Sequence, residues 1–169
     1  MITEPKIERR KKQHYVAIRM AVPIPFGNRL QIAWSEVQEW LKNKGVAAPD
    51  SGPAIIRYLT TDMSKELDLD VGFIVDKAMK GDERIIADVL PAGRYATLLY
   101  TGPYRGMGVY KANVAMVEWA KQNKIKWNIS KKKDVEWWNG RVELYLTDPE
   151  KESDTRKYQT ELAFLLAEK

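Results

Sequence analysis

A segment near the C-terminal end of the chain carries a carboxylate where it could bind or protonate a small molecule. The segment RVELYLTDP (residues 141–149) alternates apolar and polar residues, as a strand with two different faces does. Its valine and leucines share one face, while Glu143 and Tyr145 share the other. We expect the apolar face to lie under helices, which places Glu143 and Tyr145 on an opposite, concave side.

Aromatic residues are dense around this carboxylate in the sequence. The stretch EWWNGRVELY contains Trp137, Trp138 and Tyr145, and the segment YTGPY adds Tyr100 and Tyr104. Large rings around a carboxylate suit flat, hydrophobic and often cationic molecules, through stacking and cation–π contacts of roughly 0.5–2 kcal/mol each. The carboxylate would supply charge and orientation, as the few polar groups of an apolar pocket usually do.

Structural interpretations of the same residues stay open. Glu143 could be exposed on a solvated sheet face, or could form an ion pair with Arg141 or Arg57. The two adjacent tryptophans could pack on a hairpin turned at Asn139-Gly140, because this dipeptide is typical of a type I′ turn.

The chain contains two similar halves, with a period of about 80 residues. Tyr58 of the first half matches Tyr145 of the second, and Ile56 matches Glu143. The second half therefore carries a carboxylate where the first carries a hydrocarbon. The aligned blocks are YVAIRMAVP (15–23) with YATLLYTGP (95–103), VQEWLKNKGV (37–46) with MVEWAKQNKI (116–125), and PAIIRYLTTD (53–62) with GRVELYLTDP (140–149).

Each half reads as a strand, a helix and two further strands. Apolar residues at helical spacing predict one helix in each half. The last strand of each half is expected at 69–76 and at 158–167. Gly45 is expected to end the first helix. Residues 77–94 should form a turn, a short strand and a turn. The stripe residues are Leu30, Trp34, Val37 and Leu41 in the first half and Met107, Tyr110, Val114 and Val117 in the second.

These elements predict an α+β fold with an internally duplicated strand-helix-strand-strand unit. We expect antiparallel sheets with helices on one side and a ligand cleft on the other. The expected organisation is a basic N-terminal tail at 1–12 and a single domain at 13–169, with repeats at about 13–76 and 93–167.

Composition excludes several classes of function. The 169 residues include no cysteine and one histidine, His14, so thiolate catalysis, disulfides, cysteine-ligated zinc and a multi-histidine metal site are excluded within one chain. We expect no metal or organic cofactor. No segment approaches the ~18 apolar residues of a membrane span, which favours a cytoplasmic protein. The net charge is +5, and the clusters RRKK (9–12) and KKK (131–133) are expected on the solvated surface.

The motifs together resemble a known family. The pattern LPAGRYATLLYTGPY (90–104), followed by EWA and then by ELYLTDP, is similar to the GyrI-like small-molecule-binding domain, which also forms the effector-binding part of bacterial multidrug-responsive transcription activators. The resemblance covers residues 14 to 166. It implies a cleft between two repeats that takes hydrophobic, frequently cationic ligands against a buried glutamate among aromatic rings. Glu143 matches that glutamate, with Tyr145 and Tyr58 lining the cleft.

The resemblance leaves three roles. About a dozen residues precede the first expected strand, too few for a helix-turn-helix domain. The first role is binding of a hydrophobic or cationic small molecule. The second is hydrolysis of cyclopropane-containing or related electrophiles, with Glu143 as general acid or base and Tyr104 or Tyr145 as donor. The third is contact with DNA gyrase, for which no patch is identified. The expected ligand-site residues are Glu143, Tyr145, Tyr58, Tyr100, Tyr104, Trp137, Trp138 and Ile56.

Overall fold

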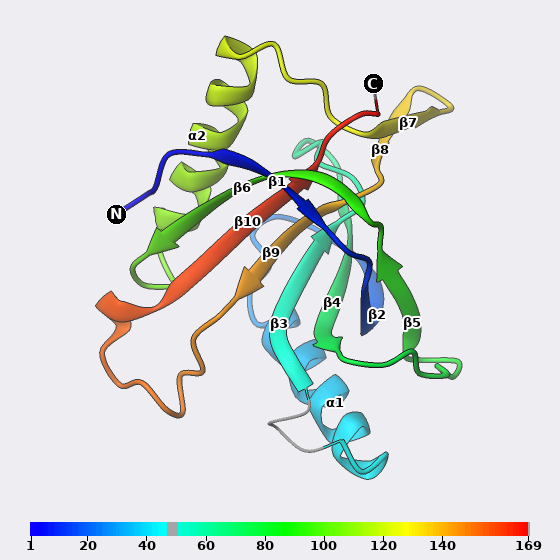
Figure 1. The fold of residues 1–169 in the computed structure, drawn as a ribbon. Coiled ribbons are helices and arrows are strands. Elements are labelled where there is room, and N and C mark those ends of the chain that lie inside the picture. The colour runs from blue at the N-terminus through cyan, green and yellow to red at the C-terminus, as the bar shows by residue number, and fades with distance from the viewer. Residues whose placement is uncertain (47–50, 169) are drawn as a thin grey trace.

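A curled antiparallel sheet with two helices forms the body of the molecule (Figure 1). The computed structural model describes residues 1–46 and 51–168. The strand order in the eight-stranded sheet is β1-β6-β10-β9-β3-β4-β2-β5, and β7 and β8 form a separate hairpin. The elements are β1 Lys6–Arg10, β2 Gln13–Val22, α1 Arg29–Asn43, β3 Ser51–Tyr58, β4 Leu67–Val75, β5 Ile86–Leu90, β6 Gly93–Thr101, α2 Gly108–Gln122, β7 Ile129–Lys132, β8 Val135–Trp138, β9 Arg141–Tyr145, a 3₁₀ turn Thr155–Lys157 and β10 Gln159–Leu165.

The elements follow the order expected from the sequence. A strand, a helix and two strands occur as β2, α1, β3 and β4, and again as β6, α2, β9 and β10 with the β7–β8 hairpin inserted after the helix. The two groups meet at the centre of the sheet, where β3 pairs with β9 and Ile56 lies opposite Glu143. Gly45 follows α1 with φ 79°, as the sequence predicts, since glycine tolerates this conformation at a helix end.

One face of the sheet is filled by its own side chains. A single core cluster joins Tyr15 of β2 and Leu90 of β5 to Tyr95 of β6 and Leu165 of β10, although these strands lie toward opposite ends of the strand order. Side chains from both ends can meet only because the sheet curls around them (Figure 1).

Both helices cover the other face. α1 buries Leu30, Ala33, Val37 and Leu41 against β2, β3 and β4. α2 buries its small residues Ala112 and Ala120, together with Met116, against β6 and β10. Cross-strand partners share a face, so one row crosses the sheet under the two helices. This row is Ile18, Val71, Ile56, Glu143, Leu162 and Leu98.

Glu143 therefore lies on the helix face, which differs from the expected concave side opposite the helices. Val142 and Leu144 instead point into the core enclosed by the curled sheet. Alternation along a strand shows that two residues share a face, but both faces of this sheet are buried. Alternation therefore could not show which of the two faces carries Glu143, and the expectation placed it on the wrong face. The expected ligand cleft on the side away from the helices is replaced by packed core.

The prediction of which face of α2 packs on the sheet is also wrong. Met107, Tyr110 and Val114 are 59%, 49% and 43% exposed, while Met116 is fully buried. The helix has two apolar faces, and helical spacing alone does not select between them. The alanine-rich face packs on the sheet because small side chains let the backbones approach closely.

The hairpin turn lies six residues before the expected one. β7 pairs with β8, and the link is Lys133-Asp134 with φ values of 51° and 64°. Positive φ at both central residues is what a type I′ turn needs. Asn139-Gly140 instead connects β8 to β9, and β9 leaves the hairpin to join the large sheet between β3 and β10.

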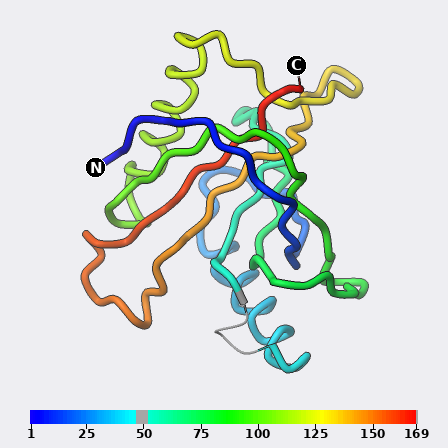
Figure 2. Tube along the Cα trace, in the orientation of Figure 1, coloured from blue at the N-terminus to red at the C-terminus, as the bar shows by residue number. Residues whose placement is uncertain are grey.

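Residues 6–10, expected within a basic tail, form the edge strand β1. They pair with β6, and the amino group of Met1 donates to the carbonyl of Thr101 over 2.9 Å. Arg10 forms an ion pair with Glu161 of β10 at 2.7 Å. Figure 2 shows the N-terminal segment running beside β6 before the chain turns into β2.

Among the helices of the described residues, neither is long and apolar enough to cross a membrane.

Candidate functional site

A buried carboxylate lies at the centre of the sheet, between the regions covered by α1 and α2. Glu143 is 3% exposed. Its Oε1 accepts hydrogen bonds from the hydroxyls of Tyr145 at 2.6 Å and Tyr58 at 3.2 Å. Its Oε2 accepts one from the side-chain amide of Asn113 on α2, at 2.9 Å. Three donors from β3, β9 and α2 thus converge on one acidic group.

Burial controls the protonation of this cluster. It raises the pKa of Glu143, while the hydrogen bonds from Tyr145 and Asn113 and the charge of Arg141 oppose the rise. Burial also raises the pKa of the Tyr58 and Tyr145 hydroxyls well above the usual value, and the charge of Glu143 adds to the effect. Both phenols therefore remain neutral donors to the carboxylate of Glu143.

Aromatic rings wall the cluster on the side of Tyr145. Trp34 of α1 meets the Tyr145 ring edge to face at 5.5 Å between centroids, and Tyr104 does so at 5.1 Å. Tyr104 also packs on Tyr158 at 4.6 Å. The indole N–H of Trp34 donates to the carbonyls of Ile55 and Gly72, both at 3.2 Å, which anchors the ring over the sheet.

A guanidinium lies on the other side of the carboxylate. The Arg141 guanidinium carbon lies 4.2 Å from the centroid of the Phe164 ring and 4.5 Å from that of Trp138. One of its nitrogens donates to the Asn113 carbonyl oxygen at 3.1 Å. Asn113 therefore bridges the two charges, donating to Glu143 and accepting from Arg141. Burial lowers the pKa of Arg141 to about 10, so the guanidinium stays charged at neutral pH.

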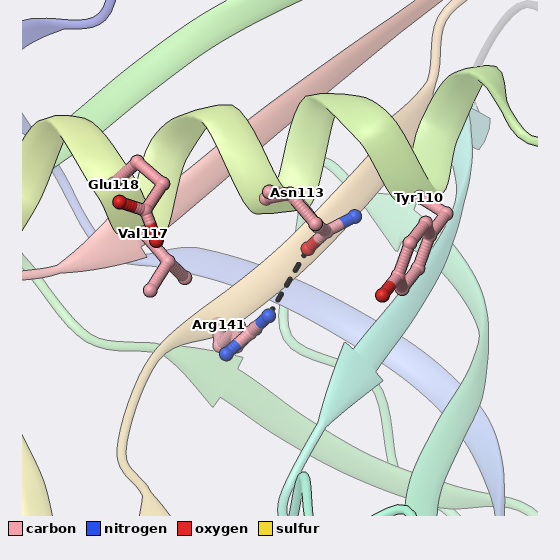
Figure 3. A pocket seen from close by; sticks show the side chains of 6 residues that line it. Tyr110, Asn113, Val117, Glu118 and Arg141 are labelled. Atoms are coloured by element: carbon pink, nitrogen blue, oxygen red, sulfur yellow. Dashed lines mark hydrogen bonds between the residues drawn. The ribbon is translucent and has the colours of Figure 1, made fainter.

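An open groove of about 220 Å³ adjoins this cluster along α2 (Figure 3). In the close-up, Arg141 extends from β9 toward the helix, with Asn113 above it and Tyr110 to one side. The groove combines an apolar helix face with one cation and the edge of the buried carboxylate cluster. Its lining residues are Tyr110, Asn113, Val114, Val117, Glu118 and Arg141.

The structure brings four of the expected site residues together. Glu143, Tyr145 and Tyr58 share hydrogen bonds, and Ile56 lies beside Glu143 in the adjacent strand. Tyr104 reaches this group only through its ring contact with Tyr145. Its hydroxyl donates to the carbonyl of Thr147 at 2.7 Å and accepts from the Thr147 N–H at 2.9 Å.

The other expected residues lie elsewhere. Tyr100 belongs to the core under α2, and its hydroxyl donates to the carbonyl of Pro103. Trp138 is buried and donates to the hydroxyl of Thr61 at 3.2 Å, so it meets the site only through Arg141. Trp137 is half-buried on the β7–β8 hairpin. Arg57 does not form the ion pair with Glu143 that the sequence left open. Its guanidinium donates to Tyr15, Val89 and Asn139 instead.

Sequence reasoning missed Asn113 as a site residue, did not identify the role of Arg141, and placed Trp34 in the core. Asn113 carried a usable signal, because asparagine is unfavourable inside a helix and has to be explained when it lies among apolar residues. Arg141 carried none, since a strand terminus often ends in an exposed arginine.

Within residues 1–46 and 51–168, no three His, Cys, Asp or Glu side chains gather to hold a metal ion.

This fold, with a buried carboxylate beside an open apolar groove, defines a small-molecule-binding domain, and comparison with known proteins agrees. The family model of the GyrI-like small molecule binding domain matches residues 3–166. The chain belongs to the GyrI-like family. A search of curated protein sequences finds no match.

Solved structures share the fold at low sequence identity. The C-terminal domain of EcmrR gives a TM-score of 0.72 at 19% identity, with 98% of each chain covered. SAV2435 bound to tetraphenylphosphonium gives 0.62 at 12% identity, covering 98% of this chain and 94% of that protein. EcmrR in its complex with DNA gives 0.76 at 19% identity and 99% coverage, and this chain spans 58% of the EcmrR chain there. At these identities the likeness establishes the fold.

Proposed function

We propose that this domain binds hydrophobic, frequently cationic small molecules in the groove along α2, with Glu143 as the charged group that holds them. The observation that supports this proposal most strongly is the buried carboxylate of Glu143 beside an apolar helix face that the fold leaves exposed. A folded chain gains little by exposing Tyr110 and Val114 on one helix, whereas a ligand that covers them gains their apolar contact area.

Desolvation of the Glu143 carboxylate favours a cationic ligand. An ionised carboxylate among apolar side chains is poorly solvated, and a cation close to it restores a favourable interaction. Such a ligand reaches the carboxylate most directly by displacing the Asn113 amide from Oε2, because Tyr58 and Tyr145 both occupy Oε1. The aromatic rings of Tyr145 and Trp34 then offer π faces and edges to the ligand.

The structural relatives support this class of ligand. SAV2435 has the same fold and is bound to tetraphenylphosphonium, a hydrophobic cation. EcmrR carries the same fold in a chain that binds DNA, so coupling of ligand binding to a further domain or partner is a second element of the proposal.

We also propose that the fold arose by duplication of the strand-helix-strand-strand unit. Ile56 and Glu143, which align between the two halves of the sequence, are direct partners across the β3–β9 pair. A pseudo-two-fold axis between these strands would relate the two halves and put the carboxylate close to it. The single site would then follow from the change of one residue near the axis.

Calorimetric titration with tetraphenylphosphonium tests the binding proposal. We expect saturable binding to the wild type and about tenfold or more weaker binding to Glu143→Gln, because the variant keeps the shape of the side chain and removes its charge. Glu36→Gln is the matched control, since Glu36 does not line the groove and forms an exposed ion pair with Arg84. Equal affinity of wild type and Glu143→Gln would refute the role of Glu143.

The raised pKa of Glu143 favours a second candidate function, the hydrolysis of cyclopropane-containing or related electrophiles. A carboxyl group with a raised pKa suits general acid or base work on water, and the Tyr145 hydroxyl lies 2.6 Å from it. Tyr145 is then a better donor than Tyr104, whose hydroxyl is engaged with Thr147. Mass spectrometry would detect a product heavier by one water that wild type makes and Glu143→Gln does not.

A further inference from the structure

Arg141 is a cation without an anionic partner at the edge of the groove. In the described part of the chain it forms no salt bridge, and its Nε is buried with no hydrogen-bond partner. Its one hydrogen bond goes to the neutral amide of Asn113. A guanidinium has five N–H donors in a planar fork, and Arg141 lines the groove, so its terminal N–H groups that do not bond Asn113 can serve a group bound there.

The packing of Arg141 fixes the guanidinium in place. Phe164 and Trp138 lie against it at 4.2 and 4.5 Å, and the Tyr58 ring lies at 5.9 Å. These rings hold the planar group in one orientation, so little side-chain entropy remains to be lost when it binds a partner. The position of the cation is therefore set before any ligand arrives.

Neither of the acidic groups nearby forms a direct ion pair with this cation. Glu118 lines the groove but pairs with Lys121 at 3.6 Å. Glu143 acts on the guanidinium through its charge but forms no direct ion pair with it. Asn113 bridges the two groups, and three donors already occupy the Glu143 oxygens. The groove thus presents a fixed positive group beside the carboxylate, rather than a carboxylate alone.

We propose that Arg141 makes the groove a binding site for the anionic group of an apolar ligand, so that this domain takes aromatic or aliphatic carboxylates, including zwitterions whose basic group meets Glu143. A carboxylate can accept two N–H bonds from the guanidinium fork while its apolar body covers the exposed face of Tyr110 and Val114. This inference deepens the proposed binding function and rests on it.

A matched pair of probes tests the inference. 2-Naphthoate carries a carboxylate on an aromatic body, and 2-naphthamide has nearly the same shape without the charge. Calorimetric titration of the wild type at about pH 7.5, a little above neutrality, should give about tenfold or more tighter binding of 2-naphthoate. Arg141→Met, which keeps an unbranched apolar stem against the Phe164 and Trp138 rings, should bind both probes equally.

Two further variants keep the test informative. Arg141→Lys retains a charge without the planar fork and should keep part of the preference for 2-naphthoate, even if Arg141→Met folds poorly. Arg9→Gln removes one exposed positive charge from β1 and should leave the preference unchanged, which separates a local effect from net charge. Equal binding of the two probes by wild type, or an unchanged preference in Arg141→Met, would overturn the proposal.

Tetraphenylphosphonium and 2-naphthamide separate the two proposals. If either compound binds but 2-naphthoate is not preferred to 2-naphthamide, the inference about Arg141 fails and the binding function stands. If none of the three compounds binds, the proposed function and the inference both fail.

Discussion

At the scale of single residues, the properties of Glu143 follow from the row in which it lies. Its neighbours across the sheet are Ile56 and Leu162, so the carboxylate is surrounded by hydrocarbon on both sides. The cost of burying it is reduced by Tyr145, Tyr58 and Asn113, which donate hydrogen bonds to it. This arrangement keeps an acidic group in the core with a raised pKa.

The raised pKa of Glu143 predicts a stability that falls as pH rises. The unfolded chain has an ordinary glutamate pKa and the folded chain a higher one, so between the two values the folded state binds more protons. The contribution is fully present below the unfolded value and is lost as pH rises through the folded one. Relative to Glu143→Gln, the wild type should lose about 1.4 kcal/mol for each unit by which the pKa is raised.

Urea denaturation of both proteins at a series of pH values from about 4 to 8, spanning the usual glutamate range and neutrality, measures this difference. Glu118→Gln serves as the control, because that carboxylate is exposed on α2. Parallel stability curves for wild type and Glu143→Gln over the whole pH range would show that the carboxyl group has an ordinary pKa in the folded protein.

At the scale of elements, α2 performs two tasks on two faces. Its alanines and Met116 pack on the sheet, whereas Tyr110, Val114 and Val117 line the groove. Asn113, between these faces, reaches down to Glu143 and Arg141. The helix therefore both completes the core and supplies most of the groove wall.

Substitutions on the two faces of α2 should have different effects. Met116→Ala should lower the free energy of unfolding by about 2–5 kcal/mol, because it leaves a cavity in a fully buried position. Val114→Ala should change stability by no more than about 0.5 kcal/mol, as expected at an exposed position, but should weaken binding of tetraphenylphosphonium. Chemical denaturation and calorimetric titration of both variants check this. A large loss of stability in Val114→Ala would place that residue in the core.

The elements also show how far the sequence could be read. Alternation and helical spacing are local signals, and the similar blocks of the two halves add to them. These patterns predicted Glu143 as the central carboxylate, both helices and the strands β2, β3, β4, β6, β9 and β10. Which face of β9 meets the helices was not predictable, since both faces are buried. The second apolar face of α2 and the Lys133-Asp134 turn were missed for a similar reason. The local sequence is compatible with either helix face and with either turn, and only tertiary packing decides between them.

At the scale of the whole molecule, Arg57 holds the curled sheet together. Its guanidinium donates to the hydroxyl of Tyr15 on β2, to the carbonyl of Val89 on β5 and to that of Asn139 before β9, each at 2.9 Å. Tyr15 in turn donates to the buried Asp70 at 2.5 Å. Segments far apart in the chain thus meet at one side chain, which closes the inner face of the sheet.

Removing this contact should destabilise the fold as a unit. Arg57→Met removes the donor to the buried Tyr15 hydroxyl and to two part-buried carbonyls, and should lower the free energy of unfolding by about 3 kcal/mol. Arg84→Met is the matched control, since Arg84 forms an exposed ion pair with Glu36 and its loss should cost less than about 1 kcal/mol. Similar losses in the two variants would indicate that Arg57 does not secure the curl.

The position of a bound ligand shows whether the site lies between α2 and Glu143. In an NMR titration with tetraphenylphosphonium, we expect intermolecular contacts from the phenyl protons to the methyl groups of Val114 and Val117, together with a chemical-shift change at the Glu143 side-chain carboxyl. The methyl groups of Leu144 and Ala163, inside the curled sheet, should show no contacts. Contacts to the enclosed core or to the β7–β8 hairpin, with the carboxyl signal of Glu143 unchanged, would contradict a ligand site between α2 and Glu143.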